Sequence, residues 1–296
     1  MKVADTGALA LGRHRGPRVT ILPDSILISA VAGQAVSQDA HAHGLPEKGD
    51  LTVWRSVDGG KTWSRTGLIN DTPGAAGEGL HAIAADASGR NLFAAWLDLR
   101  AKGTQLYGAR STDGGRTWSK NLLVYSSPDG TICQCCDPSV AIDARGHIDV
   151  MFRNALAGSR DLYLAESADG LSFSQPRKLG NGTWKLNACP MDGGGIALDH
   201  GQIVTAWRRD RNIFLDRPGA PETSLGEGKD VAITAGAKGV WIAFAGEQGI
   251  EVISPVAKAP TKISESGGFP ALAALPDGSA IAAWEQNGSI RIEKLP

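Results

Sequence analysis

All four cysteines of this chain lie in two short segments, which makes these segments the first candidates for a functional site. The first segment reads Cys133-Gln134-Cys135-Cys136-Asp137, and the second reads Cys189-Pro190-Met191-Asp192. Thiolates bind soft metal ions and react as nucleophiles, and paired thiols form disulfides. A fold that brings the two segments together would therefore create a cysteine-centred site.

Three interpretations of the cysteines are open. Two disulfides could staple loops in an oxidising compartment, and four cysteines allow three pairings. Thiolates could instead bind copper or zinc, with histidine or methionine completing the site. The third interpretation is a redox-active or reactive thiol. These interpretations overlap, because one disulfide and two free thiols are also allowed. The candidate metal ligands are Cys133, Cys135, Cys136, Cys189, His81, Met191, His41 and His43. Asp137 and Asp192 would orient these ligands or take protons.

A recurring phrase indicates which elements position these segments. It reads Ser56-Val57-Asp58-Gly59-Gly60-Lys61-Thr62-Trp63, then Ser111-Thr112-Asp113-Gly114-Gly115-Arg116-Thr117-Trp118, and in shortened form Ser167-Ala168-Asp169-Gly170-Leu171-Ser172-Phe173. Each copy follows a strand-like run, and the Asp-Gly pair is a tight-turn signal. The phrase resembles the Asp-box, or BNR repeat, of the sialidase-like β-propellers. The resemblance implies that these turns lie on the face opposite the active site.

A second repeat predicts the number of blades independently of the Asp-box phrase. Six turns rich in Gly, Asp or Pro each precede an apolar run that should be buried on both faces. The runs span residues 26–31, 92–96, 148–152, 203–207, 240–244 and 280–284. The sequence therefore predicts an all-β, six-bladed β-propeller in a single domain spanning residues 1–296. The last blade lacks residues for a fourth strand, so we expect residues 3–11 to pair into it and close the ring.

In this architecture both cysteine segments precede the first strands of neighbouring blades. We therefore expect them near the axis, on the face that carries ligand sites in the family that the chain resembles. A small ligand, a glycan or a metal ion is the expected partner at this axial face. Without a metal, no cofactor is expected.

Composition excludes several classes of function. The chain has 30 Lys and Arg against 31 Asp and Glu, a net charge of −1, and no basic stripe for nucleic acid. No apolar run approaches the roughly 18–20 residues that a membrane span needs. From the resemblance and the cysteines we expect a monomer in the periplasm or secreted, its targeting segment removed, with a cytoplasmic location as the alternative.

The resemblance also implies a test for sialidase chemistry. Sialidases of this family hold a carboxylate sugar with three arginines, attack with a tyrosine paired to a glutamate, and use an aspartate as acid/base. Arg18, Arg153 and Arg208 could form the triad, and Asp98, Asp137 or Glu285 could do acid/base work. The tyrosines are Tyr107, Tyr125 and Tyr163, so blades four to six, where the family carries its nucleophile, have none. The sequence leaves open whether the protein is an enzyme.

The sequence favours an extracytoplasmic, sialidase-like β-propeller whose axial face holds a cysteine-centred site for copper or zinc. One alternative is a glycoside hydrolase of exo-sialidase type that acts on carboxylate sugars. The other is a non-catalytic platform that binds a glycan or a protein through disulfide-stapled loops.

Overall fold

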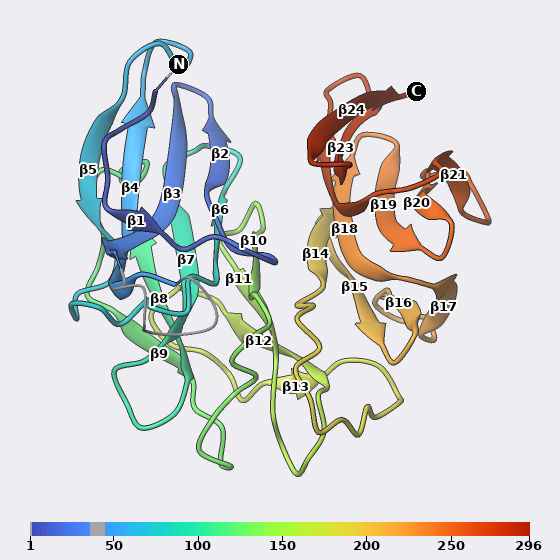
Figure 1. Cartoon of the computed structure of the whole chain (residues 1–296), viewed down its shortest axis with the longest axis horizontal. Helices are drawn as coiled ribbons and strands as arrows, with labels where there is room; N and C mark the ends of the chain where they lie inside the picture. The colour runs from blue at the N-terminus through green and yellow to red at the C-terminus, as the bar shows by residue number, and fades with distance from the viewer. Residues whose placement is uncertain (1, 36–44) are drawn as a thin grey trace. The chain divides into compact units, whose positions relative to one another are not determined.

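Every regular element in the computed structural model, which describes residues 2–35 and 45–296, is a β-strand (Figure 1). None of these residues belongs to a helix that could cross a membrane. The strands form six antiparallel sheets, one for each predicted blade, as in a six-bladed β-propeller. The chain divides into two compact units, Met1–Arg177 with Leu186–Met191, and Lys178–Lys185 with Asp192–Pro296.

The first unit contains the first three sheets. Sheet one consists of β1 (Ala8–Leu9), β2 (Arg18–Leu22), β3 (Ser25–Gln34), β4 (Glu47–Ser56) and β5 (Ser64–Leu68). Sheet two consists of β6 (His81–Ala85), β7 (Leu92–Asp98), β8 (Gln105–Ser111) and β9 (Leu122–Tyr125). Sheet three consists of β10 (Ser139–Ile142), β11 (Ile148–Arg153), β12 (Leu162–Ser167) and β13 (Arg177–Lys178), where this unit ends.

The second unit contains the remaining three sheets. Sheet four consists of β14 (Gly195–Asp199), β15 (Gln202–Arg209), β16 (Asn212–Asp216) and β17 (Thr223–Glu227). Sheet five consists of β18 (Lys229–Gly236), β19 (Gly239–Gly246), β20 (Gly249–Ile253) and β21 (Thr261–Ser264). Sheet six consists of β22 (Gly268–Ala274), β23 (Ala280–Gln286) and β24 (Ser289–Leu295).

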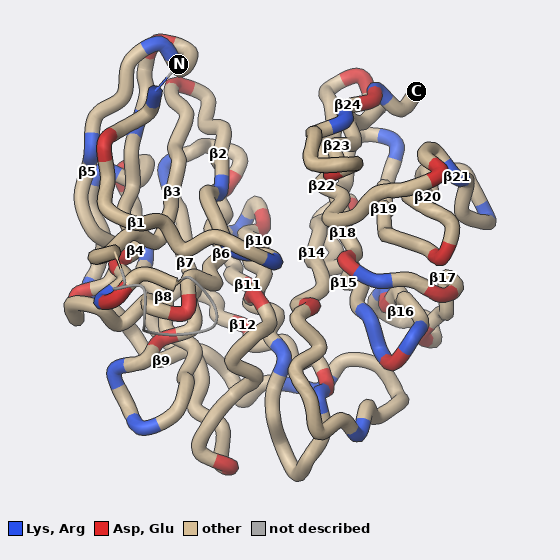
Figure 2. The backbone as a smooth tube through the Cα atoms, viewed as in Figure 1, with Lys and Arg blue, Asp and Glu red and all other residues tan. Residues whose placement is uncertain are grey.

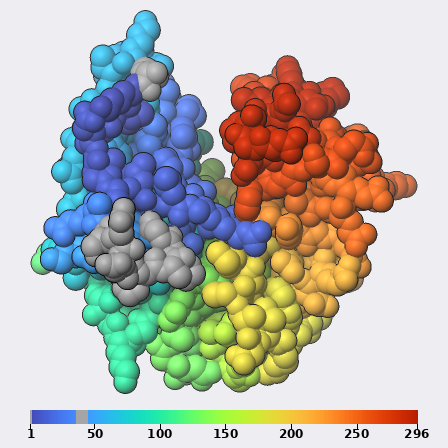
Figure 3. All heavy atoms as spheres, viewed as in Figure 1, coloured from blue at the N-terminus to red at the C-terminus, as the bar shows by residue number. Residues whose placement is uncertain are grey.

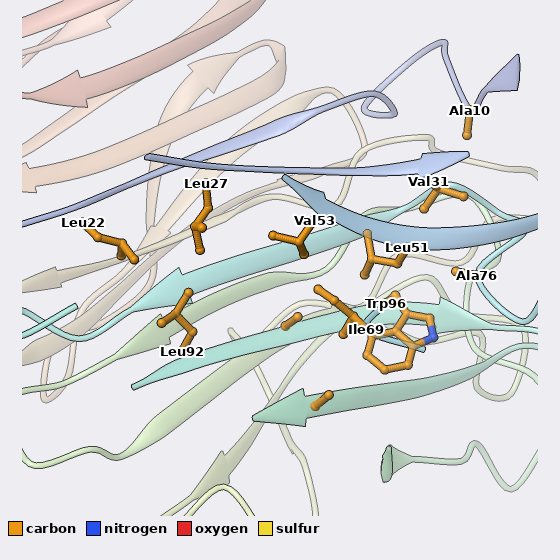
Figure 4. Packing of buried hydrophobic residues seen from close by; sticks show 12 residues of the cluster. Ala10, Leu22, Leu27, Val31, Leu51, Val53, Ile69, Ala76, Leu92 and Trp96 are labelled. Carbon is orange, nitrogen blue, oxygen red and sulfur yellow. The ribbon is translucent and has the colours of Figure 1, made fainter. Parts of the chain in front are cut away.

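The apolar runs found in the sequence become the second long strand of each sheet and build the core. All seven residues of β7 are buried, because sheets pack against both of its faces. Figure 4 shows Leu27 of β3 and Val53 of β4 lying over Leu92 and Trp96 of β7. Within each unit the first strands of successive sheets are neighbours, with β2 next to β6, β6 next to β10, β14 next to β18 and β18 next to β22.

The predicted closure of the last blade by the N-terminal segment is not confirmed. Strand β1 pairs with β3, where Ala8 lies opposite Gly33, and sheet six has three strands in the described part of the chain. The reason lies in the length of β3, because β2 covers only its first half and leaves the rest of that edge for β1. The N-terminal residues, dark blue in Figure 3, accordingly lie on the surface of the first unit.

The three Ser-Asp turns repeat one set of hydrogen bonds. Ser56 Oγ donates to Asp58 Oδ1 (2.7 Å) and accepts from the backbone N–H of Gly60 (2.8 Å). Asp58 also accepts from the Thr62 backbone, and these bonds lower its pKa to about 2, the Thr62 hydroxyl having the largest effect. The other two turns share the serine–aspartate bond and the bond from a glycine N–H to the serine. The aspartates therefore stabilise turns and carry no catalysis in this arrangement.

An arginine before two of these turns links neighbouring sheets. Arg55 Nη1 donates to the carbonyl of Gly114 (2.5 Å) in the turn of sheet two, and Arg110 Nη1 donates to the carbonyl of Asp169 (2.9 Å) in the turn of sheet three. The repeated phrase thus joins blades as well as closing hairpins. Acidic and basic residues are interspersed along both units (Figure 2).

Candidate functional site

The first cysteine segment lies between β9 and β10, fixed to the end of β11. The backbone N–H of Cys133 donates to the carbonyl of Arg153 (3.1 Å), and Ile132 forms an isolated bridge with Asn154. Ile132 also donates to the carbonyl of Thr104 (3.0 Å). These bonds hold the segment where the first strand of sheet three begins.

Three sulfur atoms meet in this loop. The Sγ of Cys133 lies 3.5 Å from that of Cys136 and 3.7 Å from that of Cys135, and the Sγ atoms of Cys135 and Cys136 are 3.9 Å apart. All three side chains are buried. They form the group of potential metal donors found among the described residues, with all donor atoms within 4.8 Å of one another.

The second cysteine segment reaches the same place through a disulfide. Cys189 is bonded to Cys135, with their Cα atoms 6.2 Å apart, whereas Cys133 and Cys136 remain thiols. The structure therefore shows one disulfide and not the two that one interpretation expected. Cys189 itself is exposed, although its partner Cys135 is buried.

Met191 packs against the three clustered cysteines. Its backbone φ is +53°, in the left-handed region that glycine and asparagine tolerate better than methionine does. Backbone strain of this kind is found most often at functional sites, where the surrounding structure holds it in place. Met191 thus packs at the cysteine cluster in a strained backbone conformation, and its role as a thioether ligand stays a prediction.

The surroundings of Cys133 favour a thiolate. The hydrogen bond with Cys136 lowers the pKa of Cys133 to about 7, and the nearby guanidinium groups of Arg153 and Arg160 act in the same direction, against the effect of burial. Arg153 is itself buried, and its Nη1 donates to the carbonyl of Arg160 (2.5 Å). Arg160 is not among the residues that the sequence singled out. It lies in the loop between β11 and β12, seven residues after Arg153, and only the folded hairpin brings it near the cysteines.

Arg18, at the start of β2, contacts residues at the starts of sheets two and three beside the cysteines. Its Nη2 lies 3.3 Å from Asp137 Oδ2 and donates to the carbonyl of His14 (2.7 Å), and its Nε donates to the carbonyl of His81 (3.3 Å). Asp137 directly follows Cys136, so this ion pair borders the cysteine cluster. Two charged candidates from the sequence, Arg18 and Asp137, thus pair with each other.

His81 is a buried neutral histidine. Its Nε2 lies 2.9 Å from the hydroxyl of Ser29, and its side chain is 1% exposed. Burial, helped by the charge of Arg18, lowers its pKa to about 3. The group of clustered donor atoms among the described residues contains cysteines and does not include His81. His41 and His43 lie outside the described residues.

Asp98 is held by a bidentate ion pair. Arg100 donates to Asp98 Oδ1 from Nε (2.8 Å) and to Oδ2 from Nη2 (3.0 Å), and the indole N–H of Trp96 donates to Oδ2 (2.8 Å). The Arg100 guanidinium also lies 4.0 Å from the centroid of the Tyr107 ring. Asp98 and Tyr107 therefore share one arginine.

The other two tyrosines belong to the packing of sheet three. The hydroxyl of Tyr125 accepts a hydrogen bond from Asn154 Nδ2 (3.1 Å), and its ring lies 5.0 Å from that of Phe152. Burial raises the pKa of Tyr163, which disfavours the phenolate that a nucleophile requires. Neither environment activates a tyrosine for attack on a sugar.

The remaining candidates belong to the second unit. Arg208 donates from Nε to the carbonyl of Asp210 (2.6 Å), and its guanidinium lies 5.4 Å from the centroid of the Trp184 ring. Asp192 is buried and accepts from the backbone N–H of Asp230 (2.9 Å), and Glu285 is exposed on β23.

Arg208 also lines a pocket of about 320 Å³ in this unit. Lys229 and Arg211 add further positive charge to its lining, although Glu227 and Glu247 bind Arg211 at 2.7 and 3.0 Å. Nothing in the sequence pattern singled out this pocket, because its residues come from four strands of sheets four and five and three of the connections between strands.

Comparison with known proteins gives the fold alone. No protein-family model matches the chain, and no curated protein was found to be related in sequence. A protein of unknown function from Dyadobacter fermentans is similar in structure, with 15% identity, a TM-score of 0.64, and coverage of 99% of this chain and 95% of that one. The α-L-arabinofuranosidase Arb93A of Fusarium graminearum is 11% identical, with a TM-score of 0.62 and coverage of 98% and 96%.

The NanB sialidase of Streptococcus pneumoniae is also similar, with 11% identity and a TM-score of 0.58 over 99% of this chain and 69% of that one. At such identities the likeness concerns architecture and not activity. The chain therefore has the fold of a six-bladed β-propeller, which it shares with these glycosidases.

Proposed function

We propose that this protein binds a soft metal ion through the thiolates of Cys133, Cys135 and Cys136. The observation that carries the proposal is the convergence of three buried sulfur atoms within 4.8 Å of one another. Two of these sulfur atoms belong to thiols, and the third belongs to the disulfide with Cys189. Cysteine usually owes its place to its reactivity or its metal binding and not to its packing.

The sulfur spacing suits a metal. A tetrahedral ion with metal–sulfur bonds of about 2.3 Å separates its sulfur ligands by ~3.8 Å. The three observed Sγ separations, 3.5, 3.7 and 3.9 Å, bracket that value. The three sulfurs would therefore need little rearrangement once Cys135 is reduced.

The nature of the donors favours copper(I), with zinc as the second choice. Thiolate and thioether ligands prefer Cu(I), and Met191 packs beside the thiols. Zinc would take a fourth ligand, which Cys189 could supply after reduction. Asp137, bound to Arg18 beside Cys136, would then help to neutralise or orient the site from outside the ligand set.

A competition titration tests the proposal. The protein is reduced, freed of reductant under anaerobic conditions, and titrated with Cu(I) or Zn²⁺ held by a chromophoric chelator. Wild-type protein should remove about one equivalent of metal from the chelator, as a single closed site would. The Cys133→Ser variant should remove much less. Equal metal uptake by the two proteins would overturn the proposal.

A second candidate function rests on the pocket that Arg208 lines. Arg208, Arg211 and Lys229, which line this pocket, would attract a carboxylate group. Solved proteins of this fold include arabinofuranosidase and sialidases. This candidate covers both a glycoside hydrolase of exo-sialidase type and a glycan-binding platform.

A panel of acidic and neutral glycosides separates those two possibilities. A hydrolase should turn over an acidic glycoside, lose activity in Arg208→Ala, and keep it in Cys133→Ser. A platform should bind an acidic oligosaccharide without turnover and lose that binding in Arg208→Ala. Absence of both binding and turnover would remove the second candidate.

We also propose a cellular location, a domain organisation and an oligomeric state for the protein. A disulfide next to two thiols suits an oxidising compartment with access to reductants, such as the periplasm or the exterior. We further propose that the chain acts as one domain and as a monomer. Analytical ultracentrifugation and a protease-resistance test would check these two points.

A further inference from the structure

The Cys135–Cys189 disulfide presents its two ends to different environments. Cys135 is 7% exposed and lies among the other two thiols, whereas Cys189 is exposed on the segment Leu186–Met191. Thiol–disulfide exchange requires the attacking sulfur to reach a disulfide sulfur in line, so access decides which sulfur is attacked. A thiol from solution meets Cys189 first.

We infer that this disulfide is a reaction site for a small thiol compound, with Cys189 as the sulfur attacked and Cys135 as the leaving group. This exchange is an activity in its own right. Its consequence for the metal rests on the proposed function, because release of Cys135 supplies the third thiolate of the cluster.

The exchange balances without an oxidant. The incoming thiolate forms a bond with Cys189 Sγ, the Cys135–Cys189 bond breaks, and its electron pair goes to Cys135 Sγ. A second thiol then attacks the mixed disulfide, which frees Cys189 and releases the oxidised dimer of the small thiol. In sum, two thiols lose two electrons and two protons, and the protein gains two thiols.

The neighbours of Cys135 favour its departure. Cys133 and Cys136 lie 3.7 and 3.9 Å from it and can donate S–H hydrogen bonds to a new thiolate. A stabilised leaving thiolate accelerates exchange.

Departure of Cys135 would also loosen the segment that covers the site. Apart from the disulfide and the packing of Met191, the segment Leu186–Met191 is held by long hydrogen bonds. Leu186 donates to the carbonyl of Gly158 (3.4 Å), and Arg160 donates to the carbonyl of Ala188 (3.3 Å). Reduction would therefore create the third thiolate and ease the entry of a metal in one event.

The experiment uses the oxidised full-length protein and reduced glutathione as the probe. Samples are quenched with acid at intervals, remaining thiols are alkylated, and each cysteine peptide is followed by mass spectrometry. We expect a glutathione adduct on Cys189, in about tenfold or greater excess over Cys135, because access selects the sulfur. Cys135 should become alkylatable as the adduct appears.

Two results would overturn the inference. One is an adduct on Cys135, or a new Cys133–Cys135 disulfide formed by internal exchange. The other is a native disulfide that reacts only after unfolding in urea. The Cys189→Ser variant is the matched control, since it lacks the disulfide and should form no glutathione adduct by exchange.

A metal titration of the same samples separates this inference from the proposed function. If Cys189 takes up glutathione but the reduced protein binds no Cu(I) or Zn²⁺, the exchange stands and the metal proposal fails. If the oxidised protein binds as much metal as the reduced one, the link between exchange and metal binding fails instead.

Discussion

The cysteine cluster and the Asp98 site differ in the kind of contacts that their side chains make. Asp98 is fully buried, and both of its oxygens accept hydrogen bonds from Arg100 and Trp96 at 2.8–3.0 Å. The three clustered cysteines are equally buried but interact with one another at 3.5–3.9 Å, through weak contacts between soft atoms. Both regions belong to the first unit, and both appeared in the sequence as candidates for chemistry.

This difference separates a structural ion pair from a group of soft donor atoms that lie close enough together to hold one metal ion. A carboxylate whose oxygens both accept hydrogen bonds from fixed donors is poorly placed to attack a substrate. Clustered thiols gain much more from a metal ion than they lose in contacts with one another. The comparison therefore assigns stability to Asp98 and reactivity to the cysteines.

The largest effect should come from breaking the Asp98 ion pair. Asp98→Asn removes the buried one of the two carboxylates that pair with Arg100, Asp71 at 3.2 Å being the other. Breaking a buried ion pair typically costs up to about 3–5 kcal/mol. Urea unfolding should show this loss in the free energy of unfolding, while metal uptake per folded protein stays unchanged. The exposed Asp277→Asn is a control for the charge change. A stable Asp98→Asn variant with altered metal uptake would reverse the assignment.

The second effect concerns the cluster itself. Cys136→Ser removes one thiolate with almost no change in volume, so folding should be retained. The affinity for Cu(I) should fall by about 100-fold or more, above the 10–100-fold that loss of a partner outside the ligand set costs. Chelator competition measures the affinity, and circular dichroism checks the fold. An unchanged affinity would exclude Cys136 from the ligand set.

The third effect tests whether His81 is a structural group that stabilises the fold. Its pKa falls from 6.5 to about 3 on folding, so the unfolded chain binds the proton more tightly. Stability is then full above pH 6.5 and declines as the pH falls toward 3, with a slope of up to about 1.4 kcal/mol per pH unit. His81→Gln, which keeps a polar partner for Ser29, should flatten this slope in urea unfolding measured at several pH values. Identical slopes in the two proteins would contradict a buried neutral histidine.

The smallest effect is expected at Met191. Met191→Leu keeps the apolar packing against the thiols and removes the thioether sulfur. If the thioether contributes to the site, affinity for Cu(I) should fall by about tenfold and affinity for Zn²⁺ should change little, because thioethers prefer soft Cu(I). A matched fall for both metals would point to packing and not to a sulfur ligand.

The fold could be predicted from the sequence much further than the site. Turn residues and doubly buried apolar runs mark six blades, because those signals are local. The pairing of the N-terminal segment could not be predicted. It depends on how β1 and β2 divide the edge of β3 between them.

The site depends on side-chain directions that no local pattern encodes. The sequence places Cys133, Cys135 and Cys136 in one loop, but the choice of Cys135 as the partner of Cys189 depends on which side chain points toward the second segment. Likewise, Arg100 follows Asp98 by two residues, and only its conformation decides that it neutralises that carboxylate.

The central claim is that the reduced cysteine cluster holds a soft metal. The most direct measurement combines elemental analysis with a thiol count on the same reduced sample after exposure to Cu(I) and removal of unbound metal by gel filtration. The account predicts about one copper per chain, four thiols after the metal is stripped and the protein denatured, and loss of the copper in Cys133→Ser. Four thiols without retained copper or zinc would contradict it.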